Sequence, residues 1–238
     1  LPGATDGLRA LEAAGSSRLL FSNNPTRGAD HYREKLTPHG IDVDPTSVLT
    51  SATVSASYLA ATHPDERVFL VGDGRLEAIL EDAAVDLTTD PDAAEVVLGS
   101  FDREFSFATL WESLRALEGD VPFYGTDPDV TIPIDEGEIP GTGAILAAME
   151  AVAGREPDAI LGKPSSVAAA AAMDRLETEP ANTLVVGDRL ETDIALGNRA
   201  GMETALVLTG VTDRATLADA AIEPDHVLES LADVETLV

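Results

Sequence analysis

Short apolar segments alternate with helical segments along most of this chain, and this alternation constrains the fold more than any other feature. The apolar segments suit strands that are buried on both faces, as in Leu184-Val185-Val186. Strands that alternate with helices indicate an α/β protein with a mainly parallel sheet. The predicted strands cover residues 18–22, 68–72, 95–100, 121–126, 159–162, 183–187 and 204–208. The predicted helices cover residues 6–14, 29–39, 51–63, 76–83, 107–117, 142–153, 165–176, 192–200 and 215–221.

Two polar stretches that contain proline, at residues 63–67 and 154–158, interrupt this pattern. They enclose a block that has strands and helices of its own. A segment inserted between two parts of one core has this organisation. The sequence therefore predicts a core domain made of residues 1–66 and 159–238, and an inserted domain at residues 67–158.

The chain is strongly acidic, with 43 Asp and Glu against 15 Lys and Arg and a formal net charge of -28. Such a surface repels nucleic-acid phosphates and anionic membranes, so we expect neither as a partner. The absence of cysteine excludes thiol catalysis and cysteine-ligated metals. Only two basic residues are lysines, Lys35 and Lys163. Acidic excess with few lysines is typical of a halophilic cytoplasm, so we expect a cytoplasmic protein that low salt loosens.

The predicted strand at residues 18–22 leads into Ser22, Asn23 and Asn24. In open α/β sheets, ligands bind at the carboxyl ends of the strands. A hydroxyl, two amides and the following N–H groups can hold phosphate oxygens there. The same residues also suit an ordinary capped turn, so the two interpretations stay open at this point.

Lys163 follows the predicted strand at residues 159–162, and Pro164 follows the lysine. An ammonium about 4 Å from one phosphate charge gains roughly 4 kcal/mol at an effective dielectric of 20, whereas a hydroxyl hydrogen bond contributes nearer 1 kcal/mol. A lysine is therefore effective against a dianion, and its retention in a lysine-poor chain favours this role. The alternative is a solvated lysine in a surface loop.

Asp188 ends another predicted strand, and Asp193 follows five residues later in the first turn of a predicted helix. Two carboxylates that face one site suit Mg²⁺, which binds oxygen ligands and keeps waters. Helix capping is an alternative for Asp193, although not for Asp188. Val71-Gly72-Asp73 repeats the strand-end pattern but lacks a second acid at this spacing, so we interpret Asp73 as a turn residue.

Several segments, in their order and spacing, resemble the haloacid-dehalogenase-like phosphatases, in the branch of p-nitrophenyl, phosphoglycolate and pyridoxal phosphatases. Residues 20–24 resemble the second family motif, residues 161–165 the third and residues 186–193 the fourth. Residues 101–107, 125–129 and 140–143 resemble parts of the cap domain of that branch. The resemblance implies a Rossmann-like doubly wound parallel sheet with an inserted α/β cap domain of the C2 type.

The resemblance also implies roles for individual residues in a Mg²⁺-dependent phosphatase of small phosphomonoesters. Asp188 would bind Mg²⁺, and Asp193 would complete the acidic cluster by ligation or by orienting its neighbours. Ser22 and Asn23 would hold phosphate oxygens, and Lys163 would neutralise charge on the phosphoryl group and the nucleophile.

Three further residues are candidates for contacts on the substrate side, namely Asn24, Asp127 and Asp129. The two aspartates suit a turn around Pro128 equally well. The resemblance leaves open phosphoglycolate, pyridoxal phosphate, sugar phosphates and nucleotides as substrates, and it allows a homodimer formed through the cap.

The first family motif, a strand that ends in an Asp-x-Asp pair, is not among these residues. We expect it upstream of Leu1, where its aspartate would form a phospho-aspartyl intermediate. The alternative is a non-catalytic module that binds a phosphate ligand or a partner on the same fold. A dinucleotide-dependent oxidoreductase is disfavoured, because Gly141-Thr142-Gly143 does not extend to the glycine fingerprint of that class.

Overall fold

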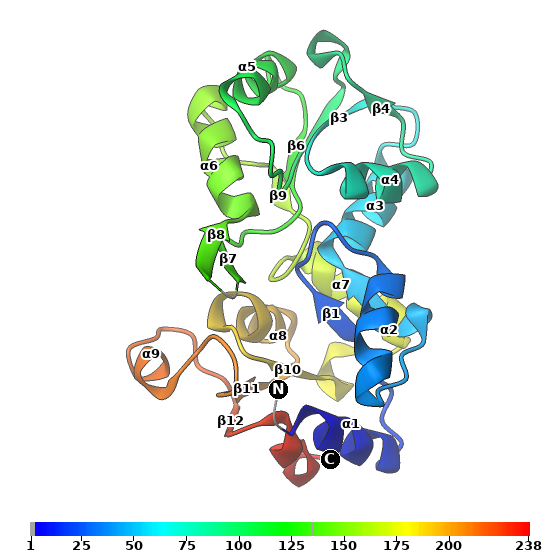
Figure 1. The fold of residues 1–238 in the computed structure, drawn as a ribbon, viewed down its shortest axis with the longest axis vertical. Helices are drawn as coiled ribbons and strands as arrows, with labels where there is room; N and C mark the ends of the chain where they lie inside the picture. Colours follow the sequence, from blue (N-terminus) through cyan, green and yellow to red (C-terminus); the bar gives the residue numbers. More distant parts are fainter. Residues whose placement is uncertain (1–2, 135) are drawn as a thin grey trace. The chain divides into compact units, whose positions relative to one another are not determined.

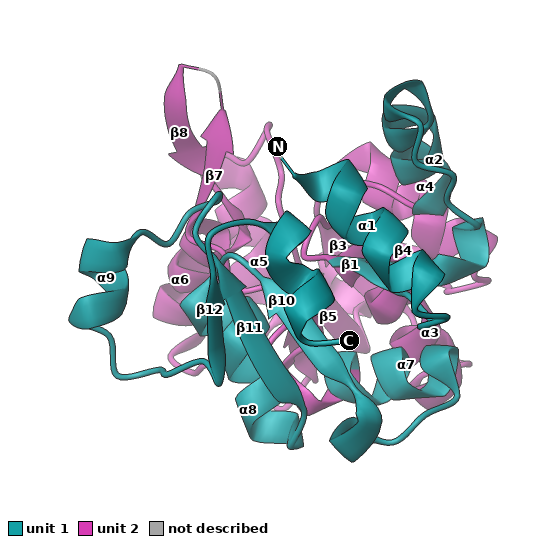
Figure 2. Ribbon diagram, turned by 90° about the horizontal axis from the view of Figure 1, so that it is seen from below, with its two compact units in different colours: residues 1–21, 29–49, 168–238 teal, residues 22–28, 50–167 magenta. Residues whose placement is uncertain are grey.

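The computed structural model of the protein describes residues 3–134 and 136–238, and it divides the chain into two compact units (Figures 1 and 2). Unit 1 contains residues 1–21, 29–49 and 168–238, and unit 2 contains residues 22–28 and 50–167. The chain passes between the units at residues 21/22, 28/29, 49/50 and 167/168. The first and third of these positions lie within two short paired strands, β1 (Leu20–Ser22) and β2 (Val48–Thr50). Each unit is described by itself below.

Unit 2 is built on a five-stranded parallel sheet with the strand order β4-β3-β5-β6-β9. Its strands are β3 (Val68–Val71), β4 (Leu87–Thr88), β5 (Val96–Gly99), β6 (Phe123–Gly125) and β9 (Ala159–Ile160). Strands β3 and β5 are paired over their full length, from Val68 opposite Val96 to Val71 opposite Gly99. The polar groups discussed below follow the carboxyl ends of β6 and β9.

Helices cover both faces of this sheet, because successive strand residues point to opposite sides. Val68 packs with α3 (Ser51–Thr62) and α4 (Gly74–Asp82), through a cluster that includes Leu59 and Leu80. Phe69, the next residue, packs in a second cluster with α5 (Phe107–Ala116) and α6 (Thr142–Ala153). The two helix pairs lie on different sides of the strands (Figure 1). This double cover explains why the strands are apolar throughout.

Unit 2 also contains an antiparallel hairpin between β6 and α6. It consists of β7 (Thr131–Ile134) and β8 (Gly137–Pro140), with Thr131 opposite Pro140. The sequence did not predict this hairpin, because its strands are short, largely exposed and interrupted by proline.

Unit 1 contains a three-stranded parallel sheet with the order β10-β11-β12. Its strands are β10 (Leu184–Gly187), β11 (Glu203–Val207) and β12 (His226–Leu228). Its helices are α1 (Ala4–Ala13), α2 (Ala29–Leu36), most of α7 (Ser166–Leu176), α8 (Ala195–Ala200) and α9 (Arg214–Ala218). Within the described residues β10 pairs only with β11, and its residues are half-buried although their side chains are apolar. The expected first-motif strand lies outside the described residues.

The structure confirms the α/β class and the parallel arrangement of the predicted strands. The two compact units divide the chain at positions other than 66/67 and 158/159, and the predicted core and inserted domains stay predictions. Helix α3 and strand β9 belong to unit 2, because α3 packs on the face of the five-stranded sheet and β9 pairs with β6. No helix in the described part of the chain combines the length and apolar character that crossing a membrane requires.

Candidate phosphate and metal site

Lys163 is a buried residue on the loop that follows β9, with 8% of its surface exposed. Its main chain is held on both sides by one side chain. Asn23 Oδ1 accepts a hydrogen bond from the N–H of Lys163, and Asn23 Nδ2 donates to the carbonyl of Lys163, both at 2.9 Å. The interpretation of Lys163 as a solvated surface lysine is therefore wrong. Burial of a single lysine requires a polar or anionic environment around its ammonium.

The contact between Asn23 and Lys163 is supported by two further residues of unit 2. The buried hydroxyl of Ser51, the first residue of α3, donates to the carbonyl of Asn23 at 2.9 Å. Gly162 allows the close approach, because a Cβ at this position would lie 2.9 Å from Asn23 Oδ1 and 2.5 Å from the carbonyl oxygen of Thr126. A larger residue at position 162 would therefore separate these segments.

Ser22 and Asn24 form the tight turn that carries Asn23. The N–H of Asn24 donates to Ser22 Oγ at 3.2 Å. Asn24 Oδ1 accepts from the N–H and the hydroxyl of Thr26, at 2.9 and 3.1 Å. The turn interpretation thus describes the local structure. The Ser22 hydroxyl and both amides thus bond to protein groups, and the roles of Ser22, Asn23 and Asn24 in contacts with phosphate or substrate stay predictions.

Asp127 follows β6 and is buried in unit 2, where 2% of its surface is exposed. Its Oδ2 accepts hydrogen bonds from the hydroxyls of Thr126 and Thr142, at 3.0 and 2.7 Å. Its Oδ1 accepts from the N–H of Asp129 at 3.2 Å. Burial raises the pKa of Asp127 to about 7, although the bond from Thr142 lowers it. These contacts with the protein and this burial favour a structural role for the carboxylate over a direct contact with substrate.

Asp129 is half-buried on the loop between β6 and β7, and its carbonyl accepts from the N–H of Gly143 at 2.9 Å. The loop is thereby tied to the start of α6. A contact of Asp129 with substrate stays a prediction.

Asp188 and Asp193 belong to unit 1 and lie around the end of β10. Asp193 is buried in a π-helical turn, Leu190–Ile194, and its Oδ2 accepts from the N–H groups of Asp188 and Arg189 at 3.2 and 3.1 Å. Asp188 Oδ2 accepts from the N–H of Val211 at 2.8 Å, and the N–H of Thr212 donates to the carbonyl of Asp188 at 3.1 Å. The two carboxylates are thus fixed by main-chain donors.

Glycines enclose this pair of carboxylates. A Cβ at Gly187 would overlap the carboxyl group of Asp193, and a Cβ at Gly210 would overlap that of Asp188. Both positions therefore need glycine if the carboxylates are to keep their places. The two acids could be predicted from the sequence, whereas Gly210 and the main chain after it could not, because they belong to a later loop that follows β11.

The donor set around β10 fits a magnesium ion in its chemistry. Mg²⁺ is commonly held by one or two carboxylates, with water and substrate phosphate as further ligands. Asp188 and Asp193 supply two carboxylates from one loop. Within residues 3–134 and 136–238 no group of three or more acidic or histidine side chains is placed to hold an ion by protein ligands alone.

The predicted site residues are divided between the units. Ser22, Asn23, Asn24, Lys163, Asp127 and Asp129 lie in unit 2, and Asp188 and Asp193 lie in unit 1. The structure brings Asn23 to Lys163, and Asp188 to Asp193. The sequence did not predict three supporting hydroxyls. Ser51 donates to the carbonyl of Asn23. Thr126 and Thr142 donate to Asp127. Asp73 caps α4 by accepting from the N–H of Arg75 at 2.9 Å, so its interpretation as a turn residue is confirmed.

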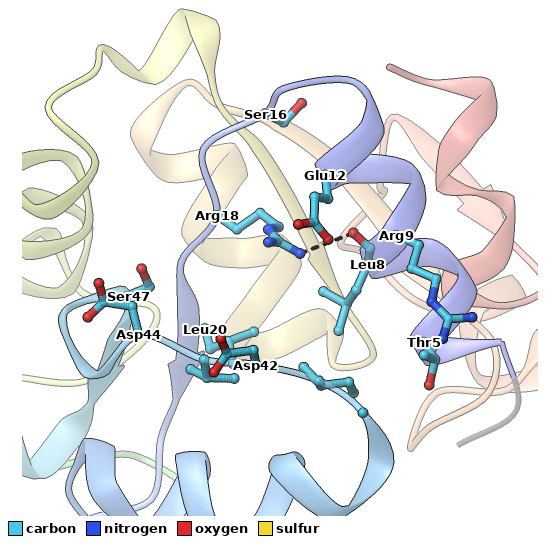
Figure 3. A pocket seen from close by; sticks show the side chains of 13 residues that line it. Thr5, Leu8, Arg9, Glu12, Ser16, Arg18, Leu20, Asp42, Asp44 and Ser47 are labelled. Atoms are coloured by element: carbon cyan, nitrogen blue, oxygen red, sulfur yellow. Dashed lines mark hydrogen bonds between the residues drawn. The ribbon is translucent and has the colours of Figure 1, made fainter.

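A cavity of about 440 Å³ lies elsewhere in unit 1 (Figure 3). It is lined by α1, by the segment before β1 and by residues 40–47. Arg18 bridges part of its wall by donating to the carbonyl of Leu8 at 3.1 Å. None of the predicted phosphate or metal residues lines this cavity.

Two family models match the ends of the chain. One is described as haloacid dehalogenase-like hydrolase and matches residues 1–86, and the other is described as HAD-hydrolase-like and matches residues 160–234. A dihydroxyacetone phosphatase of Corynebacterium glutamicum is 32% identical, over 98% of this chain and 84% of the relative. A glycerol-3-phosphate phosphatase of Gallus gallus is 35% identical, over 98% of this chain and 85% of the relative.

A solved structure of p-nitrophenyl phosphatase from Archaeoglobus fulgidus superposes on this chain with a TM-score of 0.94. The two chains are 33% identical, and the match covers 100% of this chain and 92% of the other. A 4-nitrophenylphosphatase from Thermotoga maritima gives a TM-score of 0.92 at 32% identity, over 99% and 90% of the two chains.

Proposed function

Because this chain belongs to the haloacid dehalogenase-like hydrolases, we propose that it hydrolyses small phosphomonoesters with the help of Mg²⁺. One observation carries the proposal. Lys163 is a buried lysine beyond the carboxyl end of a parallel strand, and its main chain both donates a hydrogen bond to Asn23 and accepts one from it. A fixed cation in a dry environment stabilises developing negative charge without reorganisation during the reaction.

The roles of the residues follow from their chemistry. The ammonium of Lys163 neutralises charge on the phosphoryl group, and Asn23 keeps the lysine in place. The hydroxyl of Ser22 and the N–H groups of its turn hold phosphate oxygens. Asp129 is the predicted contact on the substrate side, and the loops after β6 shape the specificity.

Mg²⁺ would be held by Asp188, with Asp193 as second ligand or as the group that orients the loop. Phosphatases of this family generally use Mg²⁺, and a bound ion supplies charge stabilisation to a phosphoryl group in transfer. The main-chain bonds to both carboxylates favour this assignment, because they orient the acids before any ion binds.

The nucleophile is proposed to be an aspartate upstream of Leu1, which forms a bond to phosphorus while the alcohol leaves. Water then attacks the phospho-aspartyl group and releases phosphate. The relatives that match this chain are themselves longer than the matched region. Residues 67–158 would act as the cap that covers the substrate and excludes water. A cytoplasmic location and a homodimer remain predictions.

Assaying a panel of phosphate esters with the full-length protein tests this proposal. The panel includes p-nitrophenyl phosphate, glycerol phosphate, a sugar phosphate, phosphoglycolate, pyridoxal phosphate and a nucleoside monophosphate, each in high salt with Mg²⁺ or with chelator. Release of inorganic phosphate that needs Mg²⁺ supports a phosphatase. Binding of phosphate esters without turnover supports the non-catalytic alternative.

A further inference from the structure

The buried carboxylate of Asp127 is part of a chain of hydroxyl groups that has a defined direction. The hydroxyl of Ser100, which follows β5, lies 2.9 Å from Thr126 Oγ1, and Thr126 donates to Asp127 at 3.0 Å. Each hydroxyl has only one hydrogen to donate. Since Thr126 gives its hydrogen to Asp127, Ser100 must donate to Thr126. Thr142 donates to the same carboxylate from the first turn of α6.

This direction depends on the charge of Asp127. An ionised carboxylate accepts every bond that it makes here. A proton on Oδ2 would have to be donated to Thr126 or Thr142, and the hydroxyl that received it would have to turn its own hydrogen elsewhere. With a proton on Oδ2 these hydrogen bonds would therefore take a second arrangement, which the ionised carboxylate does not allow.

Thr126 connects this row of hydrogen-bonded hydroxyls to Gly162, the residue before Lys163. The N–H of Gly162 donates to the carbonyl of Thr126 at 2.9 Å. A Cβ at Gly162 would come within 2.5 Å of that carbonyl oxygen, so the two main chains are in direct contact. A displacement of Thr126 is therefore passed to Gly162, and from there to the main chain that Asn23 holds at Lys163.

We propose that Asp127 is a positioning residue whose ionised form fixes Thr126, and through Gly162 the main chain that presents Lys163, whereas its protonated form relaxes this restraint. The kinetic test of this inference rests on the proposed phosphatase function. In this role Asp127 does not itself contact the substrate.

The surroundings of Asp127 place its titration near neutral pH. Burial, the largest cause, and the charge of Asp129 together raise its pKa to about 7, against the bonds from Thr142, Thr126 and the N–H of Asp129, which lower it. The hydroxyls around the carboxylate are neutral and belong to Thr126, which follows β6, and Thr142 of α6, with Ser100 after β5 behind Thr126. Asp129, on the following loop, contributes a charge.

The sign of the effect on stability follows from the raised pKa. The folded chain keeps the proton between about pH 4, where the unfolded chain loses it, and about pH 7. Stability from the neutral form is complete below this window and is lost as the pH rises through 7. The proposal therefore predicts that activity rises over a pH range in which the stability contribution of Asp127 falls.

The kinetic test measures kcat and KM for p-nitrophenyl phosphate from pH 5.5 to 9, using the full-length protein in high salt. We expect kcat of the wild type to rise with an inflection near pH 7, while KM changes little. Asp127→Asn cannot ionise, so it should lack this inflection. Above pH 8 its kcat should fall on the order of tenfold, since a displacement of about 1 Å can cost up to about 100-fold.

A second pair of variants keeps the aspartate. Thr142→Val removes a bond that lowers the pKa, so the inflection should move to higher pH, and Thr142→Ser should restore it. Asp90→Asn is the matched control, because Asp90 is an exposed acid of the same unit that only caps a turn. Its profile should equal that of the wild type.

Thermal unfolding over the same pH range supplies a readout that does not need turnover. The unfolding temperature of the wild type should fall more steeply than that of Asp127→Asn between pH 5.5 and about 7, and the two should run parallel above that. If the steeper fall is present but no variant hydrolyses esters, the phosphatase proposal fails and the titration of Asp127 stands. If Asp127→Asn keeps the wild-type kcat and inflection, or if Thr142→Val leaves the inflection unmoved, the positioning role is refuted and the phosphatase proposal stands.

Discussion

The side-chain amide of Asn23 bonds to both the N–H and the carbonyl of Lys163, across 140 residues of sequence. An amide carries a donor and an acceptor on one planar group, so it can satisfy both main-chain groups of a neighbouring residue at once. The only basic residue that is buried in the described structure is thereby oriented by the turn that follows β1. This relationship suggests that Asn23 acts on phosphate through Lys163.

Replacing Asn23 by alanine tests this relationship. The change leaves the N–H and carbonyl of Lys163 without their partners, which should cost roughly 1–3 kcal/mol of stability. We expect kcat to fall more than KM rises, because the lysine loses its position and not its charge. Urea unfolding and steady-state kinetics check the two effects. Asn182→Ala, at an exposed turn, should change neither; equal effects in both variants would contradict the role of Asn23.

The two lysines of the chain allow a controlled test of charge. Lys163→Met removes the buried ammonium and keeps most of its volume, so kcat should fall on the order of 100-fold or more, as when one transition-state donor is removed. Lys35→Met removes the same charge from an exposed position on α2 and should leave kcat unchanged. Phosphate release measured at saturating ester distinguishes the variants. Equal activity of Lys163→Met and wild type would exclude the proposed role.

The glycines that approach the two acids of unit 1 can be replaced by alanine one at a time. A Cβ at Gly210 would occupy the place of the Asp188 carboxyl group, so Gly210→Ala should displace that carboxylate and raise the Mg²⁺ concentration needed for half-maximal activity. Gly74→Ala is the control, since position 74 begins α4 and has free space for a methyl group. Titration of activity with Mg²⁺ should separate the two, and an unshifted Gly210→Ala curve would count against the assignment.

The charge of -28 predicts a strong effect of salt on stability. At about 0.1 M salt the Debye length is near 10 Å and the acidic surface repels itself, whereas at about 1 M it is near 3 Å. The unfolding temperature should therefore rise as KCl increases from about 0.1 to 3 M. Sucrose, which screens no charge, separates this effect from general exclusion of cosolutes. A temperature that is independent of KCl would contradict the electrostatic explanation.

Much of the fold follows from the pattern of the sequence. The strands at Val68, Val96 and Leu184 are apolar runs without competing signals, and α6 covers the same residues as its prediction. The short strands β2, β4 and β12 were missed, because two or three residues carry no periodicity. The hairpin β7–β8 was missed because exposed strands with proline look like a loop.

The charged groups of the candidate site could be predicted from the sequence, but the side chains that hydrogen-bond to them could not. Lys163 stands out because the chain has only two lysines, and Asp188 and Asp193 stand out because two acids follow one predicted strand at a spacing of five residues. Thr126 and Thr142 carry no such signal, since hydroxyls are common in turns, and only the fold shows that both donate to Asp127. For the same reason the sequence left Asp127 equally balanced between turn and substrate contact, whereas burial favours a third role.

The most direct test of the account compares two aspartates that follow the same Val-Gly pattern. Phosphate release from p-nitrophenyl phosphate is measured with the full-length wild type, Asp188→Asn and Asp73→Asn, with Mg²⁺ and with chelator. The account predicts Mg²⁺-dependent turnover in the wild type and in Asp73→Asn, where asparagine caps α4 as well as aspartate does, and no metal-dependent turnover in Asp188→Asn. Unchanged turnover in Asp188→Asn would contradict it.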